Sequence, residues 1–383
     1  GHLMVEHVFF ALYDDRVQEY AILPSEAYAI KHIIARNDIY LGAIGQLQRP
    51  APVEELADFA EDSRLAQELQ ERSARLIFPL RDADRLLGFI ILTGKVSGAK
   101  YSAEEMNLLQ VLSNQLVGAL TNARLYAETI EKRRLEEEVA MARQIQIGLL
   151  PRSLPGGDCF ALAAHSVTSR TVGGDFYDVI KLDDERYCLV IADASGKGMP
   201  AAMVITQIQA MIRSELNNNV GIQRALANVN NYLVSLTSAE KYATLCLGIF
   251  NSADNSFEYV NAGHNYPALI RRDGSIERLA VGGMIVGAFP GAQYESATVT
   301  LNSEEFIFFF TDGISETMNE AEEEYGEDRL IDFLRSLADK SLAPDDIIER
   351  TLEDVDRFFK EDPPADDRTI IVLKATHDTV AAP

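Results

Sequence analysis

The sequence predicts an α/β protein of two domains joined by a long helix, with two face-to-face sheets and outer helices in the second domain. The chain has 383 residues, of which 47% are hydrophobic and 25% charged, enough for two cores and a connector. An apolar stripe with alternating three- and four-residue spacing covers residues 109–130. Many short apolar runs, interrupted by two pairs of helical segments, fill residues 160–375.

Residues 5–122 are expected to form a small α/β domain. Strands are expected at residues 8–12 and 20–23, and helices at 52–60 and 63–72. Two apolar runs at residues 76–80 and 86–92 are separated by the polar turn Arg81-Asp82-Ala83-Asp84, which is the pattern of a β-hairpin. Ser102 is the expected N-cap of the next helix, since Glu105 completes a capping box.

That helix is expected to continue as a coiled-coil connector over residues 123–151. Its apolar stripe runs through Leu109, Leu112, Leu116, Ala119, Ala123, Tyr126 and Ile130, then resumes at Leu135, Val139, Ala142 and Leu149. A stripe that continues where no domain core remains favours packing against a second copy over a monomeric linker. We therefore expect a parallel homodimer, with the helix ending near Pro151.

Residues 156–376 are expected to form the second domain. Strands are expected at residues 161–167, 187–192, 243–250, 256–261, 268–271, 276–279, 297–301, 305–311 and 369–373, and helices at 199–217, 222–236, 327–338 and 344–359. Short strands flanking helix pairs indicate an α-β-β-α sandwich.

The charge balance and the lack of long apolar runs argue against nucleic acid and membrane as partners. The chain carries 35 Lys and Arg against 59 Asp and Glu, a net charge of -24, which repels nucleic acid and anionic membrane surfaces. No apolar run approaches the roughly 20 residues that cross a bilayer, and no signal-peptide pattern is present. Cys159, Cys188 and Cys246 lack the paired spacing of a disulfide framework or a thiolate zinc site. We expect a cytoplasmic protein that binds neither nucleic acid nor membrane.

Four segments place an Asp beside a Gly or another small residue at one end of an apolar run. They are Val172-Gly173-Gly174-Asp175, Val190-Ile191-Ala192-Asp193-Ala194-Ser195-Gly196, Phe308-Phe309-Phe310-Thr311-Asp312-Gly313 and Asp366-Asp367-Arg368-Thr369-Ile370-Ile371. Taken singly, each is explained by an Asp that caps a turn and a Gly that supplies its φ angle. Central strands of one sandwich end close together, however, and would bring all four carboxylates to one place.

Such a cluster is strongly repulsive unless cations offset its charge. The segments contain carboxylate and carbonyl oxygens without Cys or His ligands, and this hard donor set selects Mg²⁺ or Mn²⁺ over zinc. The sequence therefore predicts a site for divalent cations, and no other cofactor.

These segments, in this order, resemble the metal-dependent protein phosphatases of the PPM, or type 2C, family. The bacterial branch typified by the sporulation phosphatase SpoIIE and the stress phosphatase RsbU is the most similar. Further segments that resemble it are Ile145-Gln146-Ile147-Gly148-Leu149-Leu150-Pro151, Asn261-Ala262-Gly263-His264-Asn265-Tyr266-Pro267 and Thr311-Asp312-Gly313-Ile314-Ser315-Glu316. The resemblance covers residues 140–375.

The resemblance implies a role for each matching residue. Asp193 would bridge two divalent ions, with the Ala194 carbonyl completing one site and Asp312 and Asp366 holding the second. Asp175 would act through metal-bound water, and Arg170 would bind the phosphate with its planar guanidinium. Asp367 is the alternative to Asp366 as ligand, and Gly174 and His264 are secondary candidates. His264 could protonate the leaving oxygen, but a structural hydrogen-bonding role is favoured.

The resemblance implies a phosphoserine and phosphothreonine protein phosphatase, a two-metal hydrolase that acts on a phosphorylated anti-sigma-factor antagonist. A catalytically silent binding module with the same fold is the alternative, and loss of a metal carboxylate would be its mark. None of the four is lost. A cysteine phosphatase needs Arg six positions after Cys, where this chain has His165, Ala194 and Ser252.

Residues 76–126, with their hairpin and terminal long helix, resemble the GAF sensor fold. This implies a small-molecule pocket, although all cysteines lie further along the chain, which excludes a thioether-linked bilin. Sensing and pure dimerisation both remain open for this domain. We expect it to regulate the phosphatase through the connector, where the five-residue step from Ile130 to Leu135 shifts the phase of the stripe.

Overall fold

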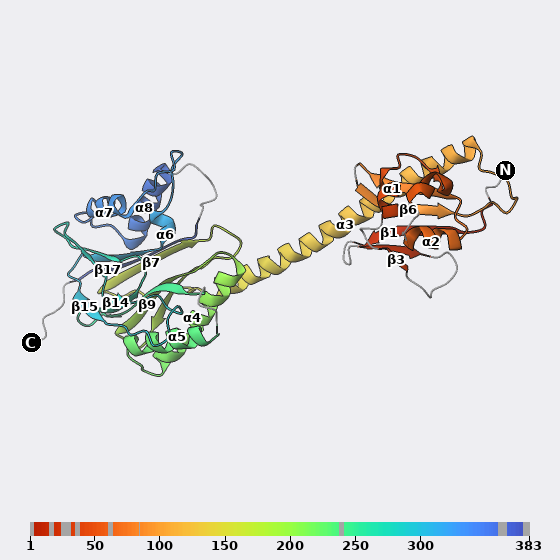
Figure 1. Cartoon of the computed structure of the whole chain (residues 1–383). Helices are drawn as coiled ribbons and strands as arrows, with labels where there is room; N and C mark the ends of the chain where they lie inside the picture. The colour runs from red at the N-terminus through yellow and green to blue at the C-terminus, as the bar shows by residue number, and fades with distance from the viewer. Residues whose placement is uncertain are drawn as a thin grey trace, which may run out of the picture. The chain divides into compact units, whose positions relative to one another are not determined.

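The computed structural model describes residues 4–14, 19–23, 32–34, 39–59, 64–83, 85–236, 241–358 and 366–377. The chain divides into two compact units, Gly1–Arg134 and Leu135–Pro383 (Figure 1). Each unit is considered by itself.

The N-terminal unit contains a six-stranded antiparallel sheet in the order β3-β2-β1-β6-β5-β4. The strands are β1 (Val8–Asp14), β2 (Glu19–Leu23), β3 (His32–Ile34), β4 (Ala51–Pro52), β5 (Leu76–Asp82) and β6 (Arg85–Leu92). Helices α1 (Ile39–Gln46) and α2 (Arg64–Glu71) pack on one face through Ile44, Leu69 and Phe89. The start of helix α3 (Ala103–Leu149) packs on the other face, against Phe78 and Leu92.

Several expectations for this unit are confirmed. Strands β5 and β6 form the expected hairpin. The capping box at the start of α3 is also present: the Ser102 N–H donates to Glu105 Oε2 at 2.6 Å, and the Glu105 N–H donates to the Ser102 hydroxyl at 3.3 Å. The helix α2 lies within the expected range 63–72, although residue 63 is outside the described residues.

Two features of this unit differ from expectation. The α-helix predicted at residues 52–60 is wrong, because Val53–Phe59 forms a 3₁₀ helix, η1, after strand β4; residue 60 lies outside the described residues. The Val53 N–H donates to the Arg75 carbonyl at 3.1 Å, which ties this segment to the sheet. Helix α1 was not predicted, because its sequence is apolar nearly all round and shows no polar face.

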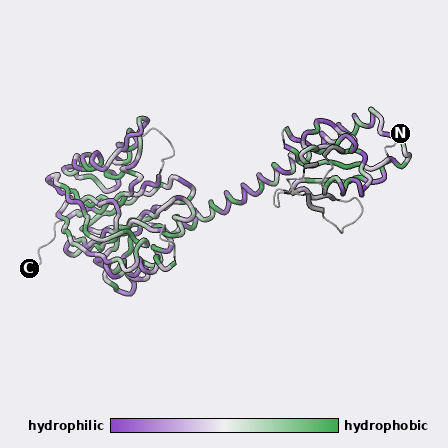
Figure 2. The backbone as a smooth tube through the Cα atoms, in the orientation of Figure 1, coloured by the Kyte–Doolittle hydropathy of each residue, from purple (hydrophilic) through white to green (hydrophobic). Residues whose placement is uncertain are grey.

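The long helix α3 carries many exposed apolar side chains. Figure 2 shows hydrophilic and hydrophobic residues alternating along it. Tyr126 is 70% exposed, and Leu125, Ile130 and Leu135 are about half exposed. None of the helices in the described part of the chain is both long and apolar enough to span a membrane.

The C-terminal unit contains two sheets. One has the order β14-β11-β10-β9-β8, with β15 paired to β11, and the other has the order β13-β12-β16-β17-β7. The strands are β7 (Phe160–Val167), β8 (Asp175–Lys181), β9 (Arg186–Ala194), β10 (Ala243–Asn251), β11 (Ser256–Ala262), β12 (Ala268–Ile270), β13 (Ile276–Arg278), β14 (Gly282–Gly283), β15 (Ala297–Thr300), β16 (Phe306–Phe310) and β17 (Arg368–Ala375).

Three apolar clusters order this unit into layers. The central cluster joins both sheets, with Ile191 and Phe250 from the first and Phe309 and Ile371 from the second. A second cluster packs helices α4 (Met199–Asn217) and α5 (Ile222–Leu236) on the outer face of the first sheet. A third packs α7 (Glu327–Arg335) and α8 (Pro344–Phe358) on the second (Figure 1). The sheets thus lie between two helical layers.

The expected helices 199–217 and 222–236 agree with α4 and α5 at both ends. Strand β8 was missed, because the charged Asp178 interrupts its apolar run. Asp178 is fully buried, and Arg213 of α4 neutralises it with bonds of 2.7 and 2.8 Å. That partner is 35 residues away, so no local pattern reveals it.

Candidate metal centre

The four carboxylates singled out from the sequence come from neighbouring strand ends. Asp175 starts β8, and its Cα pairs with that of Asp193 on the adjacent strand β9. Asp312 begins the short helix α6 (Asp312–Ser315) directly after β16, and Asp366 lies just before β17. Strands β16 and β17 are neighbours in the second sheet. Both sheets therefore contribute acidic side chains to one end of the unit.

The pKa values of three of these carboxyls show that they crowd one another. Burial, together with the charges of Asp312 and Asp366, raises the pKa of Asp193 to about 7. Burial and the Asp366 charge raise the pKa of Asp312 above its ordinary value. The pKa of Asp175 is raised well above its ordinary value by burial and by Asp193. The folded chain therefore disfavours the ionised cluster.

The donor atoms at this place suit hard divalent cations, because the cluster consists of carboxylate and carbonyl oxygens. A Cβ atom at Gly174 would lie 3.1 Å from the Ala194 carbonyl oxygen and 3.3 Å from Asp193 Oδ1. Gly174 thus keeps the space beside these two oxygens open. The residues fit a divalent centre by donor chemistry and by space.

The side chains are not drawn together into a ligand shell. Among the described residues, no three His, Cys, Asp or Glu side chains are arranged closely enough to hold a metal ion. Lys197 Nζ lies 2.6 Å from Asp366 Oδ2, and both side chains are about 40% exposed. A protein cation therefore faces the cluster and offsets part of its charge.

Asp366 and Asp367 point to different surroundings. Asp367 is buried, and both of its carboxylate oxygens accept hydrogen bonds from the loop before β8. Ser169 donates to Oδ1 through its backbone N–H at 2.7 Å and its hydroxyl at 3.0 Å, and Gly174 donates to Oδ2 at 2.6 Å. Asp367 is therefore occupied in holding this loop, whereas Asp366 faces the cluster.

Comparison with known proteins identifies the families that the two units match. Residues 183–376, slightly more than half of the chain, match the family described as Stage II sporulation protein E (SpoIIE). The chain belongs to the SpoIIE family. Residues 3–120 match the GAF domain, so the N-terminal unit is a GAF domain.

Two relatives of this SpoIIE-family chain and one solved structure illustrate the similarity. Protein IcfG of Synechocystis sp. is 25% identical over 266 residues, covering 60% of this chain and 42% of the relative. The phosphoserine phosphatase RsbU of Bacillus subtilis is 27% identical over 188 residues, covering 49% and 56%. The chain thus spans about half the length of these relatives.

The SiaA-PP2C domain of Pseudomonas aeruginosa has a TM-score of 0.55 and 21% identity, covering 64% of this chain and 98% of that domain. This likeness shows a PP2C-like fold with mixed α/β content in the C-terminal unit.

Two residues near the cluster were given no role from the sequence. The Thr311 hydroxyl is fully buried and donates to Asp175 Oδ2 at 2.7 Å, while its oxygen accepts the Thr369 N–H at 2.9 Å. Burial and the charge of Asp312 raise the pKa of Glu316, which places its carboxyl close to the cluster. Both residues belong to the segment 311–316 that resembles the phosphatase family, so their place in that motif could have indicated a role near the cluster.

The remaining candidates, His264 and Arg170, differ in exposure. His264 is buried, its Nδ1 shares a 2.8 Å hydrogen bond with the Thr244 hydroxyl, and burial lowers its pKa to about 4. A neutral, buried imidazole is poorly placed to protonate a substrate. Arg170 is exposed and, within the described part of the chain, has no ion-pair partner.

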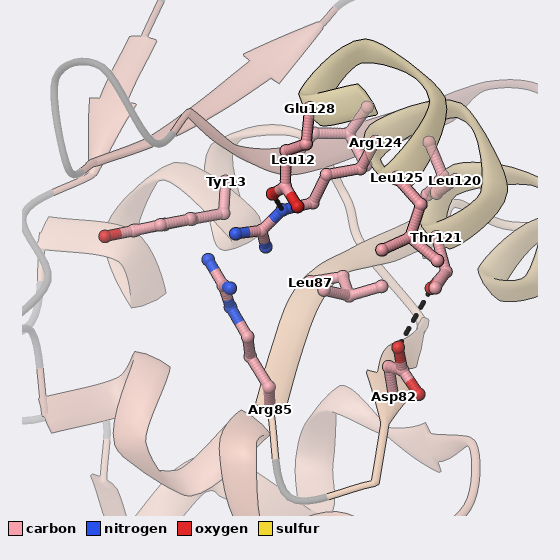
Figure 3. A pocket seen from close by; sticks show the side chains of 10 residues that line it. All are labelled: Leu12, Tyr13, Asp82, Arg85, Leu87, Leu120, Thr121, Arg124, Leu125 and Glu128. Carbon is pink, nitrogen blue, oxygen red and sulfur yellow. Dashed lines mark hydrogen bonds and ion pairs between the residues drawn. The ribbon is translucent and has the colours of Figure 1, made fainter. Parts of the chain in front are cut away.

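The GAF domain has a pocket of about 470 Å³ between β1, β6 and α3. Figure 3 shows the guanidinium groups of Arg85 and Arg124 turned toward each other there. Arg124 Nε also contacts Glu128 at 2.9 Å, and the Thr121 hydroxyl donates to Asp82 at 3.0 Å. The pocket presents both signs of charge, so its lining alone selects no class of ligand.

The raised pKa of Asp193 predicts how stability depends on pH in chelator-treated protein. The folded state keeps a proton on Asp193 up to about pH 7, whereas the unfolded chain releases it near pH 4. The free energy of unfolding should therefore fall as pH rises through this window, by on the order of a few kcal/mol. Urea unfolding at pH 5 and pH 7.5 measures it.

Asp193→Asn should remove much of this pH dependence, and Asp158→Asn, which alters an exposed aspartate, should not. Added Mn²⁺ should restore stability to the wild type at pH 7.5. An unchanged pH dependence in Asp193→Asn would show that this carboxyl does not carry the effect.

Proposed function

We propose that this chain is a metal-dependent phosphatase that removes phosphate from serine or threonine of a partner protein. The observation that carries the proposal is that Asp175, Asp193 and Asp312 lie at neighbouring strand ends and have raised pKa values, beside Asp366. Membership of the SpoIIE family supports it. The relative RsbU, described as a phosphoserine phosphatase, favours phosphoserine as the substrate group.

Five residues would serve two Mg²⁺ or Mn²⁺ ions. They are Asp193, which would bridge the ions, the Ala194 carbonyl, Asp312, Asp366 and, through water, Asp175. When bound, the ions supply an activated water and offset the charge that develops on the phosphate. Asp366 is preferred to Asp367, because both oxygens of Asp367 already hold the loop that carries Asp175.

The protein's own groups then bind and orient the substrate. Arg170 is exposed on the loop before Asp175, where its guanidinium can grip a phosphate with two parallel hydrogen bonds. Thr311 orients the Asp175 carboxyl by donating to Oδ2. His264 serves the structure by bonding Thr244.

The wider assignments follow from the same family. We assign residues 5–122 to the GAF domain, 123–151 to a coiled-coil connector and 156–376 to an α-β-β-α phosphatase sandwich. The substrate would be a phosphorylated anti-sigma-factor antagonist in the cytoplasm. The alternative, a silent binding module, is not favoured because all four carboxylates are present at the strand ends.

Phosphate release from a phosphoserine protein in the presence of Mn²⁺ tests the proposal. Asp193→Ala and Asp312→Ala should each lower kcat/KM at least about a hundredfold, because each removes a ligand worth several kcal/mol of transition-state stabilisation. Asp158→Ala should retain wild-type activity. Full activity in both variants, each with unchanged circular dichroism, would refute the mechanism.

We also propose that α3 forms a parallel homodimer and passes the state of the GAF domain to the phosphatase. The exposed apolar side chains Leu125, Tyr126, Ile130 and Leu135 support the dimer, because a second helix would cover them. The five-residue step between Ile130 and Leu135 supports two alternative phases of contact.

Deletion of Lys132 and Arg133 shifts the phase of the helix by roughly 200°, a little more than half a turn. Phosphatase activity should change at least about fivefold, the lower range of allosteric coupling, while the unfolding temperature stays the same. The double substitution of both residues by Ala, which keeps the phase, is the control. Unchanged activity after the deletion would argue against coupling, and a monomer by light scattering would argue against the dimer.

A further inference from the structure

One side chain near the end of α3 contacts the loop that carries Asp175. Gln146 Nε2 donates to the Gly173 carbonyl oxygen at 2.8 Å, and Gln146 Oε1 accepts the Gly173 N–H at 3.1 Å. The amide of one residue therefore binds both polar backbone groups of another, 27 residues away. Two bonds fix the direction as well as the distance of the contact.

The polar backbone groups of Gly173 and Gly174 all have partners. Gln146 binds both groups of Gly173, Asp367 accepts the Gly174 N–H at 2.6 Å, and the Ala194 N–H donates to the Gly174 carbonyl at 3.1 Å. These partners come from helix α3, from the segment before β17 and from the end of β9. The segment before Asp175 is thus held by three separate parts of the fold, one of which is the end of helix α3.

Backbone contacts are the principal means of holding this segment, because the two glycines have no side chains to pack. A Cβ at Gly173 would come within 2.5 Å of Asp367 Oδ2 and 2.6 Å of the Thr168 methyl, so the position excludes a side chain. Glycine also has the widest range of backbone conformations to restrict. Losing one anchor would widen the range of positions open to Asp175.

The end of α3 is itself firmly attached to the phosphatase fold. Gln209 of α4 donates to the Leu149 carbonyl at 2.8 Å and to Asp178 Oδ2 at 3.2 Å. Leu150 packs against both the inter-sheet cluster and the cluster beneath α4. Helix α3 therefore contacts the loop before β8 directly, through Gln146. It is linked to β8 itself through Gln209 of α4, which bonds both Leu149 and Asp178.

We propose that Gln146 is a positioning residue, whose amide clamps Gly173 and so lets the end of the connector helix set the position of Asp175. The inference rests on the proposed phosphatase function and adds a residue outside the carboxylate cluster to it. A turn or shift of α3 at this point moves the Gln146 amide, and with it the loop. The clamp is the direct contact between the connector and the catalytic loop.

Gln146→Ala in the full chain tests the proposal against Gln144→Ala. Gln144 lies on the same helix and is exposed. Its substitution by Ala is the same change of residue type at a position away from the loop. We expect kcat with a phosphoserine protein and Mn²⁺ to fall about ten- to a hundredfold in Gln146→Ala, as for a misplaced catalytic group, with KM unchanged. Gln144→Ala should behave as the wild type in both constants.

Hydrogen–deuterium exchange of the Gly173 amide gives a readout that needs no activity. The exchange should become about tenfold faster in Gln146→Ala, because the N–H loses its acceptor, and remain at the wild-type rate in Gln144→Ala. Wild-type kcat together with wild-type exchange in Gln146→Ala would overturn the clamp. An inactive wild-type protein would instead refute the phosphatase function, while the exchange measurement would still decide whether the clamp exists.

Gln146→Glu keeps the length of the side chain and an acceptor for the Gly173 N–H, but replaces the donor by a charged oxygen facing the Gly173 carbonyl. It should lower kcat at least as much as Gln146→Ala, and a merely space-filling role for Gln146 would leave it active. Full activity in Gln146→Glu would therefore also overturn the proposal.

Discussion

Mutual repulsion among carboxylates at the ends of two packed sheets is the constraint on which this site depends. Burial, together with the charges of neighbouring carboxylates, raises the pKa values of Asp193 and Asp312. Holding like charges close together destabilises the fold, and bound divalent cations would offset this destabilisation. Inter-sheet packing reaches close to these strand ends, because Ile191 and Phe309 of the central cluster lie two and three residues from Asp193 and Asp312.

Hydrogen bonds from several parts of the fold hold the loop that carries Asp175. Asp367 accepts hydrogen bonds from Ser169 and Gly174, and its charge also raises the pKa of Asp193. Thr311 orients Asp175. Gln146 adds a contact from the connector helix. Two acidic residues of one motif thus differ in their partners, because Lys197 faces Asp366 and the loop before β8 binds Asp367. The same loop is contacted from the segment before β17, from the end of β9 and from α3.

Features of the structure that depend on neighbouring residues in the chain could be predicted from the sequence. Amphipathic spacing set both ends of α4 and α5, and a capping box marked the start of α3. Asp beside Gly at the end of apolar runs marked the cluster residues. The features that could not be predicted depend on partners distant in the sequence. Strand β8 was missed because its Asp178 is neutralised by Arg213 of α4. The role of Asp367 could not be told from that of Asp366 because Asp367 bonds Ser169, nearly two hundred residues away. The segment after β4 was expected as an α-helix and forms the 3₁₀ helix η1, whose first N–H bonds to the Arg75 carbonyl.

We propose that this cluster holds two divalent ions between Asp193, Asp312 and Asp366. Anomalous X-ray diffraction at the manganese edge, from crystals of the full chain grown with Mn²⁺, tests that claim directly. We expect two anomalous peaks that share Asp193, one of them also bound by Asp312 and Asp366. Peaks bound through Asp367 in place of Asp366, or no manganese at these strand ends, would contradict it.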